Sequence, residues 1–185
     1  SARSINMVDR ISYILFRLAE GIISVIPMRI CYWIGSSTGT LLFYLLKKYR
    51  SLAIRNLRFA YGDSQSESEL AKIAKLHFST LSANFLCSVK ITTLSSERVE
   101  DYVEFEGTEY LQKSEIEKTP IIYLTPHMGA WELLAQIKSV APSIKQGAIY
   151  RALSNKLIDK QVLKRREQNG LKAFDRKDGF QAPIK

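Results

Sequence analysis

The stretch that decides the fold is residues 119–135, TPIIYLTPHMGAWELLA. Its apolar run Ile121–Leu124 is bounded by prolines, which predicts a short strand buried in a parallel sheet. The run stops at Pro126, His127 follows directly, and a helix is expected from about Gly129. In α/β sheets, functional residues gather where the carboxyl end of a strand turns into a helix. His127 and Glu132 are therefore the candidate site.

The spacing of these two residues restricts how they can meet. On one continuous helix, a separation of five residues places side chains roughly 140° apart. His127 and Glu132 can therefore approach only if the histidine lies in a loop and the glutamate in the first turns of a helix. Pro126 favours such a break, because it lacks an N–H and restricts the residue before it.

A histidine paired with a carboxylate has a specific chemical use. The carboxylate fixes the imidazole tautomer and favours the protonated form, so the other ring nitrogen can act as a general base. The spacing alone is equally compatible with an ordinary loop histidine and a solvated acid near the positive end of a helix.

The composition is that of a globular protein of about one domain, with 46% hydrophobic and 24% charged residues among 185. Cys31 and Cys87 lie in apolar surroundings without partner spacing and are expected to be reduced core residues. With only two histidines in the chain, a zinc site is disfavoured, and no metal or cofactor is expected.

The net charge is +9, and its distribution along the chain is uneven. Residues 145–185 hold eleven Lys or Arg against four Asp or Glu, a balance of 11 − 4 = +7. Such a surface favours an acidic partner: nucleic acid, anionic lipid, a phosphorylated substrate or an acidic protein. Nucleic acid is the weakest of these, because no nucleic-acid-binding module is recognisable and the cations are not interleaved with aromatic residues.

Residues 11–46 are strongly apolar, and Ile30–Leu46 carries no charge over 17 residues, the lower limit for a spanning helix. Basic residues flank both ends of the apolar stretch, so its orientation is undecided. We predict a membrane anchor within residues 1–46, either spanning the bilayer or lying in its interface, followed by a catalytic domain over 47–185. The alternative is a buried helical hairpin with its turn near Pro27.

Periodicity and turn residues predict the remaining elements. Helices are expected over 49–62, 67–90 (capped by Asp63 and Ser64), 109–117 and 155–169, and strands over 99–106, 147–151 and 171–174. The strand–helix alternation after residue 119 indicates an α/β fold with a mostly parallel sheet flanked by helices. Strand ends would then bring His127, Arg151 and Asp175 or Arg176 to one edge.

His127-Met-Gly-Ala-Trp-Glu132 resembles the His-x4-acid motif of glycerolipid-type acyltransferases, in the form found in bacterial lipid A biosynthesis acyltransferases. The resemblance extends from about residue 11 to the last residue. The other matching segments, in chain order, are Ile54-Arg55-Asn56-Leu57, Phe59-Ala60-Tyr61, Phe105-Glu106-Gly107, Tyr150-Arg151, Asn155 with Leu157-Ile158-Asp159, Arg166, Gly170 and Asp175-Arg176-Lys177-Asp178.

The resemblance implies a function and roles for residues. An enzyme of the bacterial inner membrane, with its site on the cytoplasmic side, would move a fatty acyl chain from an acyl-carrier-protein thioester to a hydroxyl group of a lipid A precursor. His127 would be the general base, Glu132 would orient it, and Arg166 would donate to the oxyanion. Arg151 and Arg176 would bind phosphate or pantetheine groups of the substrates.

Two departures from the family pattern leave alternatives. Ala130 stands where the family usually has asparagine, and the chain is shorter than family members, so we expect part of the carboxyl-terminal fold to be missing. One alternative keeps the fold and changes the acceptor to a lysophospholipid, glycerol phosphate or a mannosylated phosphoinositide. Another is an inactive membrane-bound fragment.

Overall fold

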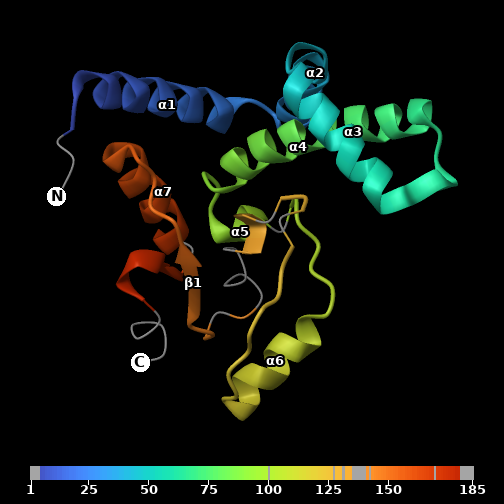
Figure 1. Cartoon of the computed structure of the whole chain (residues 1–185). Helices are drawn as coiled ribbons and strands as arrows, with labels where there is room; N and C mark the ends of the chain where they lie inside the picture. The colour runs from blue at the N-terminus through green and yellow to red at the C-terminus, as the bar shows by residue number, and fades with distance from the viewer. Residues whose placement is uncertain are drawn as a thin grey trace. The chain divides into compact units, whose positions relative to one another are not determined.

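In the residues that the structure describes, the chain is mainly helical, with one small parallel sheet (Figure 1). The computed structural model describes residues 5–99, 101–126, 128–130, 132–134, 141, 143–168 and 170–179. Its elements are α1 (Met7–Val25), α2 (Met28–Leu45), α3 (Lys47–Tyr61), η1 (Gly62–Ser64), α4 (Glu67–Ile91), α5 (Ser96–Val99), α6 (Thr108–Glu117), β1 (Gln146–Tyr150), α7 (Lys156–Gln168), β2 (Leu171–Asp175) and η3 (Arg176–Asp178).

These elements form two compact units. One unit contains α1 up to Ser24 together with α6, α7, β1 and β2; the other contains α2, α3 and nearly all of α4. The predicted boundary between an anchor and a catalytic domain at residue 46 concerns membrane attachment, and it stays a prediction.

The apolar amino-terminal segment forms two helices, α1 and α2, which are separated at Ile26 and Pro27. The break has a local cause, because Pro27 has no N–H to continue the hydrogen bonding of α1 and disfavours the helical conformation at Ile26. Pro27 is the N-cap residue of α2. Within the part of the chain that the structure describes, none of the helices combines the length and apolar character needed to cross a bilayer.

Two glycines bring α2 close to α4. Gly35 and Gly39 lie one helical turn apart on the same face of α2, and both are buried. A Cβ added at Gly35 would stand 2.6 Å from Ala83 Cα, and one at Gly39 would overlap the carbonyl oxygen of Phe78. Only glycine permits this approach of the two helix backbones.

The start of α4 shows a correction to the predicted cap. Asp63 and Ser64, expected to cap this helix, instead form part of the short helix η1. The cap is Ser66, whose Oγ accepts a hydrogen bond from Glu69 N at 3.4 Å while Glu69 Oε2 accepts from Ser66 N at 2.7 Å. This reciprocal pair is a capping box. The long helix itself begins and ends within one residue of the predicted 67–90.

The carboxyl-terminal half confirms the parallel pairing. β1 and β2 pair in parallel, with Gln146 opposite Leu171 and Tyr150 opposite Asp175, and α7 connects them. The predicted strands 147–151 and 171–174 and the helix 155–169 therefore form within one or two residues of the expected positions. The short predicted helix at 109–117 is present as α6.

Two predicted strands are wrong. Ile121–Leu124 has no regular structure, and Ile122 and Leu124 are 96% and 99% exposed. A strand needs a paired neighbour, and in the described part of the chain β1 and β2 pair only with each other. In 99–106, Val99 ends the short helix α5 and 101–106 contain no strand. The fold is thus mainly helical with a two-stranded parallel sheet.

Candidate active site

The histidine motif is described in part. His127 and Trp131 lie outside the described residues, as do 135–140 of the helix expected to follow them. Gly129 is described and has a φ of +59°, in the left-handed region that glycine adopts without strain. Residues 132–134 form a single 3-10 turn. Gly129 and Ala130 form a bend instead of the expected start of a helix, and the contact between His127 and Glu132 stays a prediction.

Glu132 is bound by Arg166 of α7. Arg166 Nε donates to Glu132 Oε2 at 3.1 Å, and Arg166 Nη2 donates to Glu132 Oε1 at 2.5 Å. The Arg166 side chain is 22% exposed and the Glu132 side chain is 28% exposed, so solvent reaches the pair only in part. Two parallel hydrogen bonds between a guanidinium and a carboxylate fix both position and orientation. The structure therefore joins two of the predicted site residues that are 34 positions apart.

The turn that carries Glu132 is also attached to the sheet. Gln146, the first residue of β1, donates from Nε2 to the carbonyl oxygen of Leu134 at 2.6 Å. Together with Arg166, this contact ties residues 132–134 to both β1 and α7. Gln146 was not predicted as a site residue, since nothing in its local sequence distinguishes it from any other strand residue.

The Glu132–Arg166 pair leaves capacity for further bonding. An ionised carboxylate has about four lone-pair positions, and the pair uses one on each oxygen. Glu132 can therefore hold Arg166 and still accept a hydrogen bond from an imidazole. Arg166 contacts Glu132 through Nε and Nη2, so its Nη1 hydrogens are not engaged with that carboxylate.

Arg151 and Arg176 lie at one edge of the sheet. Arg151 follows β1 and Arg176 follows β2, directly beyond the paired residues Tyr150 and Asp175. Both arginines are exposed. The parallel register thus gives the arrangement predicted for them: two guanidinium groups at neighbouring strand ends, available to an anionic ligand.

The loop before α7 is closed by two polar residues. Asn155 Oδ1 accepts from the N–H groups of Leu157 at 3.0 Å and Ile158 at 3.3 Å, which caps the helix. The buried Asp159 accepts from Leu153 N at 2.7 Å through Oδ1. These contacts fix where α7 begins, and so fix the position of Arg166 nearly three turns later.

The protein-family model of the bacterial lipid A biosynthesis acyltransferases matches residues 5–185 of the sequence. The chain belongs to this family. The match covers nearly the whole chain and supports acyltransferase activity with a lipid acceptor. Comparisons with curated proteins and with solved structures gave no significant match. In this acyltransferase, Asn155 and Asp159, two residues of the segment that resembles the family, serve to position α7.

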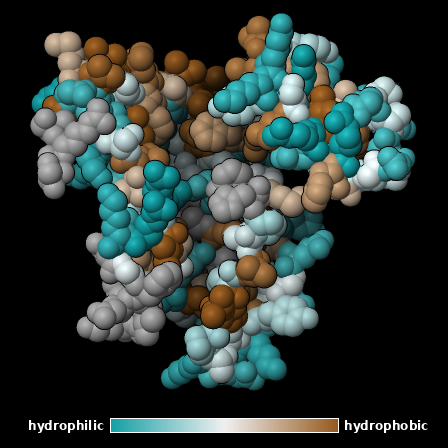
Figure 2. Space-filling model, viewed as in Figure 1, coloured by the Kyte–Doolittle hydropathy of each residue, from teal (hydrophilic) through white to brown (hydrophobic). Residues whose placement is uncertain are grey.

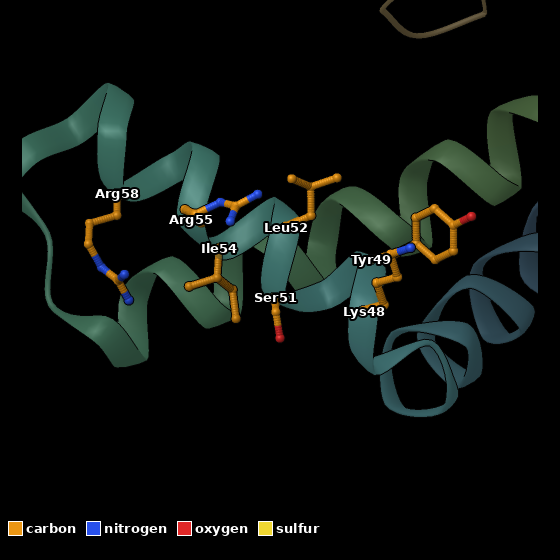
Figure 3. Close-up of a pocket in the computed structure, with 7 residues that line it drawn as sticks. All are labelled: Lys48, Tyr49, Ser51, Leu52, Ile54, Arg55 and Arg58. Atoms are coloured by element: carbon orange, nitrogen blue, oxygen red, sulfur yellow. The ribbon is translucent and has the colours of Figure 1, made fainter.

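A basic hollow lies along α3 of the acyltransferase (Figure 3). It has a volume of about 630 Å³ and is lined by Lys48, Tyr49, Ser51, Leu52, Ile54, Arg55 and Arg58. Four exposed residues of α3 recur at i, i+4, i+7 and i+11, so they share its outward face: Lys48, Leu52, Arg55 and Phe59. Cationic and apolar side chains alternate along this face, and Phe59 is 93% exposed.

Proposed function

We propose that this acyltransferase moves a fatty acyl chain from an acyl-carrier-protein thioester to a hydroxyl or hydroxyacyl group of a lipid A precursor. The observation that carries the proposal is the bidentate Glu132–Arg166 pair. It holds a carboxylate five positions after His127, where an imidazole needs an orienting partner.

The reaction needs no nucleophile from the protein. His127 takes the proton of the acceptor hydroxyl as its oxygen forms a bond to the thioester carbonyl carbon. The tetrahedral intermediate then breaks its C–S bond, and the departing thiolate receives the proton from the imidazolium. General-base assistance of this kind contributes about 10²–10⁴-fold to the rate. The Nη1 group of Arg166 is our proposed donor to the oxyanion.

The acceptor is a lipid, and two surfaces support attachment of the enzyme to a membrane. Apolar side chains gather on the surface over α1 (Figure 2), among them the exposed Ile14, Leu18 and Ile22. The outward face of α3 alternates cations with apolar side chains, as expected of a helix lying on anionic lipid headgroups. We propose that α1 and α3 hold the enzyme on the cytoplasmic side of the bacterial inner membrane.

The proposed donor is an acidic carrier protein, for which the basic residues of 145–185 provide a docking surface. Arg151 and Arg176 would take the phosphate of the donor's prosthetic group or of the lipid. Both ligands present oxygen anions that a guanidinium binds with two hydrogen bonds.

The test is consumption of an acyl-carrier-protein thioester by the purified enzyme, with and without a lipid A precursor. We expect acceptor-dependent consumption that is lost in His127→Ala and retained in His77→Ala. His77 is the chain's other histidine and is exposed on α4, so its substitution is a matched control. If thioester is consumed only when a lysophospholipid or glycerol phosphate is added, the proposed reaction holds and the acceptor is that lipid or glycerol phosphate instead of a lipid A precursor. Equal activity in His127→Ala would contradict the proposal.

A further inference from the structure

Glu20 is a buried carboxylate in a helix whose apolar side chains are exposed. It is 4% exposed, whereas Ile14, Leu18 and Ile22 of the same helix are all more than half exposed. The polar face of α1 is therefore turned toward the protein. Burying a charged group is costly unless it is paired and hydrogen-bonded, so the partners of Glu20 define what this face is for.

Two of these partners come from α7. Glu20 Oε1 accepts from Arg165 Nε at 3.0 Å, and Glu20 Oε2 accepts from Gln161 Nε2 at 3.3 Å. Arg17, one turn earlier on α1, approaches Glu20 Oε2 at 3.2 Å through Nη1. Gln161 and Arg165 lie one turn apart and share one face of α7, so the Glu20 carboxylate contacts both of them.

A second contact ties the other end of α7 to α1. Asn155, which caps α7, donates from Nδ2 to the carbonyl oxygen of Asp9 at 2.9 Å. Asp9 and Glu20 are separated by eleven positions, and Asn155 and Arg165 by ten, which is about 15 Å along either helix. The contacts occur in the same order along α1 and α7, so polar side chains attach α7 to α1 near both of its ends.

The residue after Arg165 is Arg166, which binds Glu132. Neighbouring arginines of one helical turn thus bind two carboxylates from distant parts of the chain, Glu20 of α1 and Glu132 of the histidine motif. A helix residue projects about 100° from its neighbour, so fixing Arg165 also fixes the direction in which Arg166 leaves α7.

We propose that Glu20 is a positioning residue for acyl transfer: it sets the rotation of α7 so that Arg166 meets Glu132. This inference rests on the proposed function and extends it to a residue of the amino-terminal helix. Substituting Glu20 removes the buried carboxylate that Arg165 Nε binds, so the contact that sets the rotation of α7 at this end is weakened. Displacement of a site by about 1 Å can cost 10²-fold in rate.

The test compares Glu20→Gln with Glu109→Gln. Both changes convert a glutamate to its amide, but Glu109 is an exposed residue of α6 and takes part in none of the contacts described above for α7. We expect kcat of Glu20→Gln to fall about 10–100-fold with KM for both substrates unchanged, and partial recovery in Glu20→Asp. Glu109→Gln should keep wild-type kcat. Wild-type kcat in a folded Glu20→Gln protein would overturn the proposal.

Gln161→Met provides a milder variant if Glu20→Gln does not fold. It keeps the size of the side chain and removes only the longer of the two contacts from α7. A several-fold loss of kcat at unchanged KM supports the proposal, and wild-type kcat contradicts it.

Hydrogen exchange separates failure of this inference from failure of the proposed function, because it requires no activity. Backbone amides of 132–134 should exchange faster in Glu20→Gln than in wild type, and at the wild-type rate in Glu109→Gln. Unchanged exchange in both variants overturns the positioning role whether or not the enzyme transfers acyl groups. Faster exchange in an enzyme that consumes no thioester would support the coupling and reject the reaction.

Discussion

Arg166 binds both carboxylate oxygens of Glu132, from Nε at 3.1 Å and from Nη2 at 2.5 Å. This relationship connects the histidine motif to α7, the helix that joins the two strands of the sheet. It also gives Arg166 a positioning function in addition to the oxyanion contact proposed for it, since the remaining Nη1 hydrogens are not engaged with Glu132. The planar geometry of the Arg166 guanidinium, and not only its charge, is therefore expected to affect turnover.

Replacing Arg166 by lysine tests the importance of that geometry. Lysine keeps the charge but cannot form two parallel hydrogen bonds to Glu132. We expect kcat of Arg166→Lys to fall about 10²–10³-fold, as for loss of an oxyanion donor, with little change in KM. The measurement is steady-state turnover at two salt concentrations. A variant with wild-type kcat and a salt-sensitive KM would instead identify Arg166 as a surface docking charge.

Gly39→Ala should destabilise the unit formed by α2, α3 and α4. The added Cβ would overlap the backbone of Phe78, and overpacking of this kind costs about 1–3 kcal/mol. Gly21→Ala is the control, because nothing lies within 4 Å of a Cβ at this position of α1. There the gain in helix propensity should stabilise the protein by about 0.5–1 kcal/mol. Equal urea-unfolding midpoints for the two variants would show that α2 and α4 do not approach closely at Gly39.

The outward face of α3 should bind anionic lipid. Each cation near an anionic membrane contributes about 1 kcal/mol to the binding free energy. The double variant Lys48→Gln/Arg55→Gln should therefore bind vesicles rich in phosphatidylglycerol roughly 30-fold more weakly. The control is Lys72→Gln/Lys113→Gln, which removes two exposed charges from α4 and α6. Binding to neutral vesicles, which we attribute to α1, should be unaffected in both. Equal binding of the two variants to anionic vesicles would exclude α3 as the contact.

The acid sensitivity of the fold should include a contribution from Glu69. Hydrogen bonds from the hydroxyl and the N–H of Ser66 lower the pKa of Glu69 below its usual value. Since the unfolded chain then binds the proton more tightly, this contribution is present above pH about 4.3 and is lost as the pH falls through the lower, folded-state pKa.

Glu69→Gln should therefore be less stable than wild type near neutral pH, and the two proteins should converge in acid. The measurement is the urea-unfolding midpoint between pH 7 and pH 3, with Glu106→Gln as the control for loss of an exposed carboxylate. A constant difference between Glu69→Gln and wild type across that range would disprove the assignment.

Local patterns in the sequence were sufficient for several elements. The basic amphipathic pattern ending at Gly62 predicted α3, and the basic stretch stopped by Asn169-Gly170 predicted α7. The apolar runs after residue 145 predicted β1 and β2 in parallel. The capping box Ser66-Glu-Ser-Glu69 was present in the sequence and was missed, because Asp63 and Ser64 are equally good caps.

The remaining features depend on distant contacts. Ile121–Leu124 has the composition of a buried strand, but burial requires neighbouring elements to cover it. Glu20, Gln146 and Arg165 have no local signature, since each acts through a partner far along the chain. Arg166 was selected only by its family resemblance, and its contact with Glu132 emerged from the fold.

The central claim is that Glu132 and Arg166 act as one unit in acyl transfer, and turnover in a double-mutant cycle tests it most directly. Residues in contact give non-additive losses, whereas independent residues give losses that multiply. We predict that Glu132→Gln and Arg166→Gln each lower kcat by at least about 10²-fold, and that the double variant is no slower than the slower single variant. Losses that multiply in the double variant, or wild-type kcat in either single variant, would contradict the account.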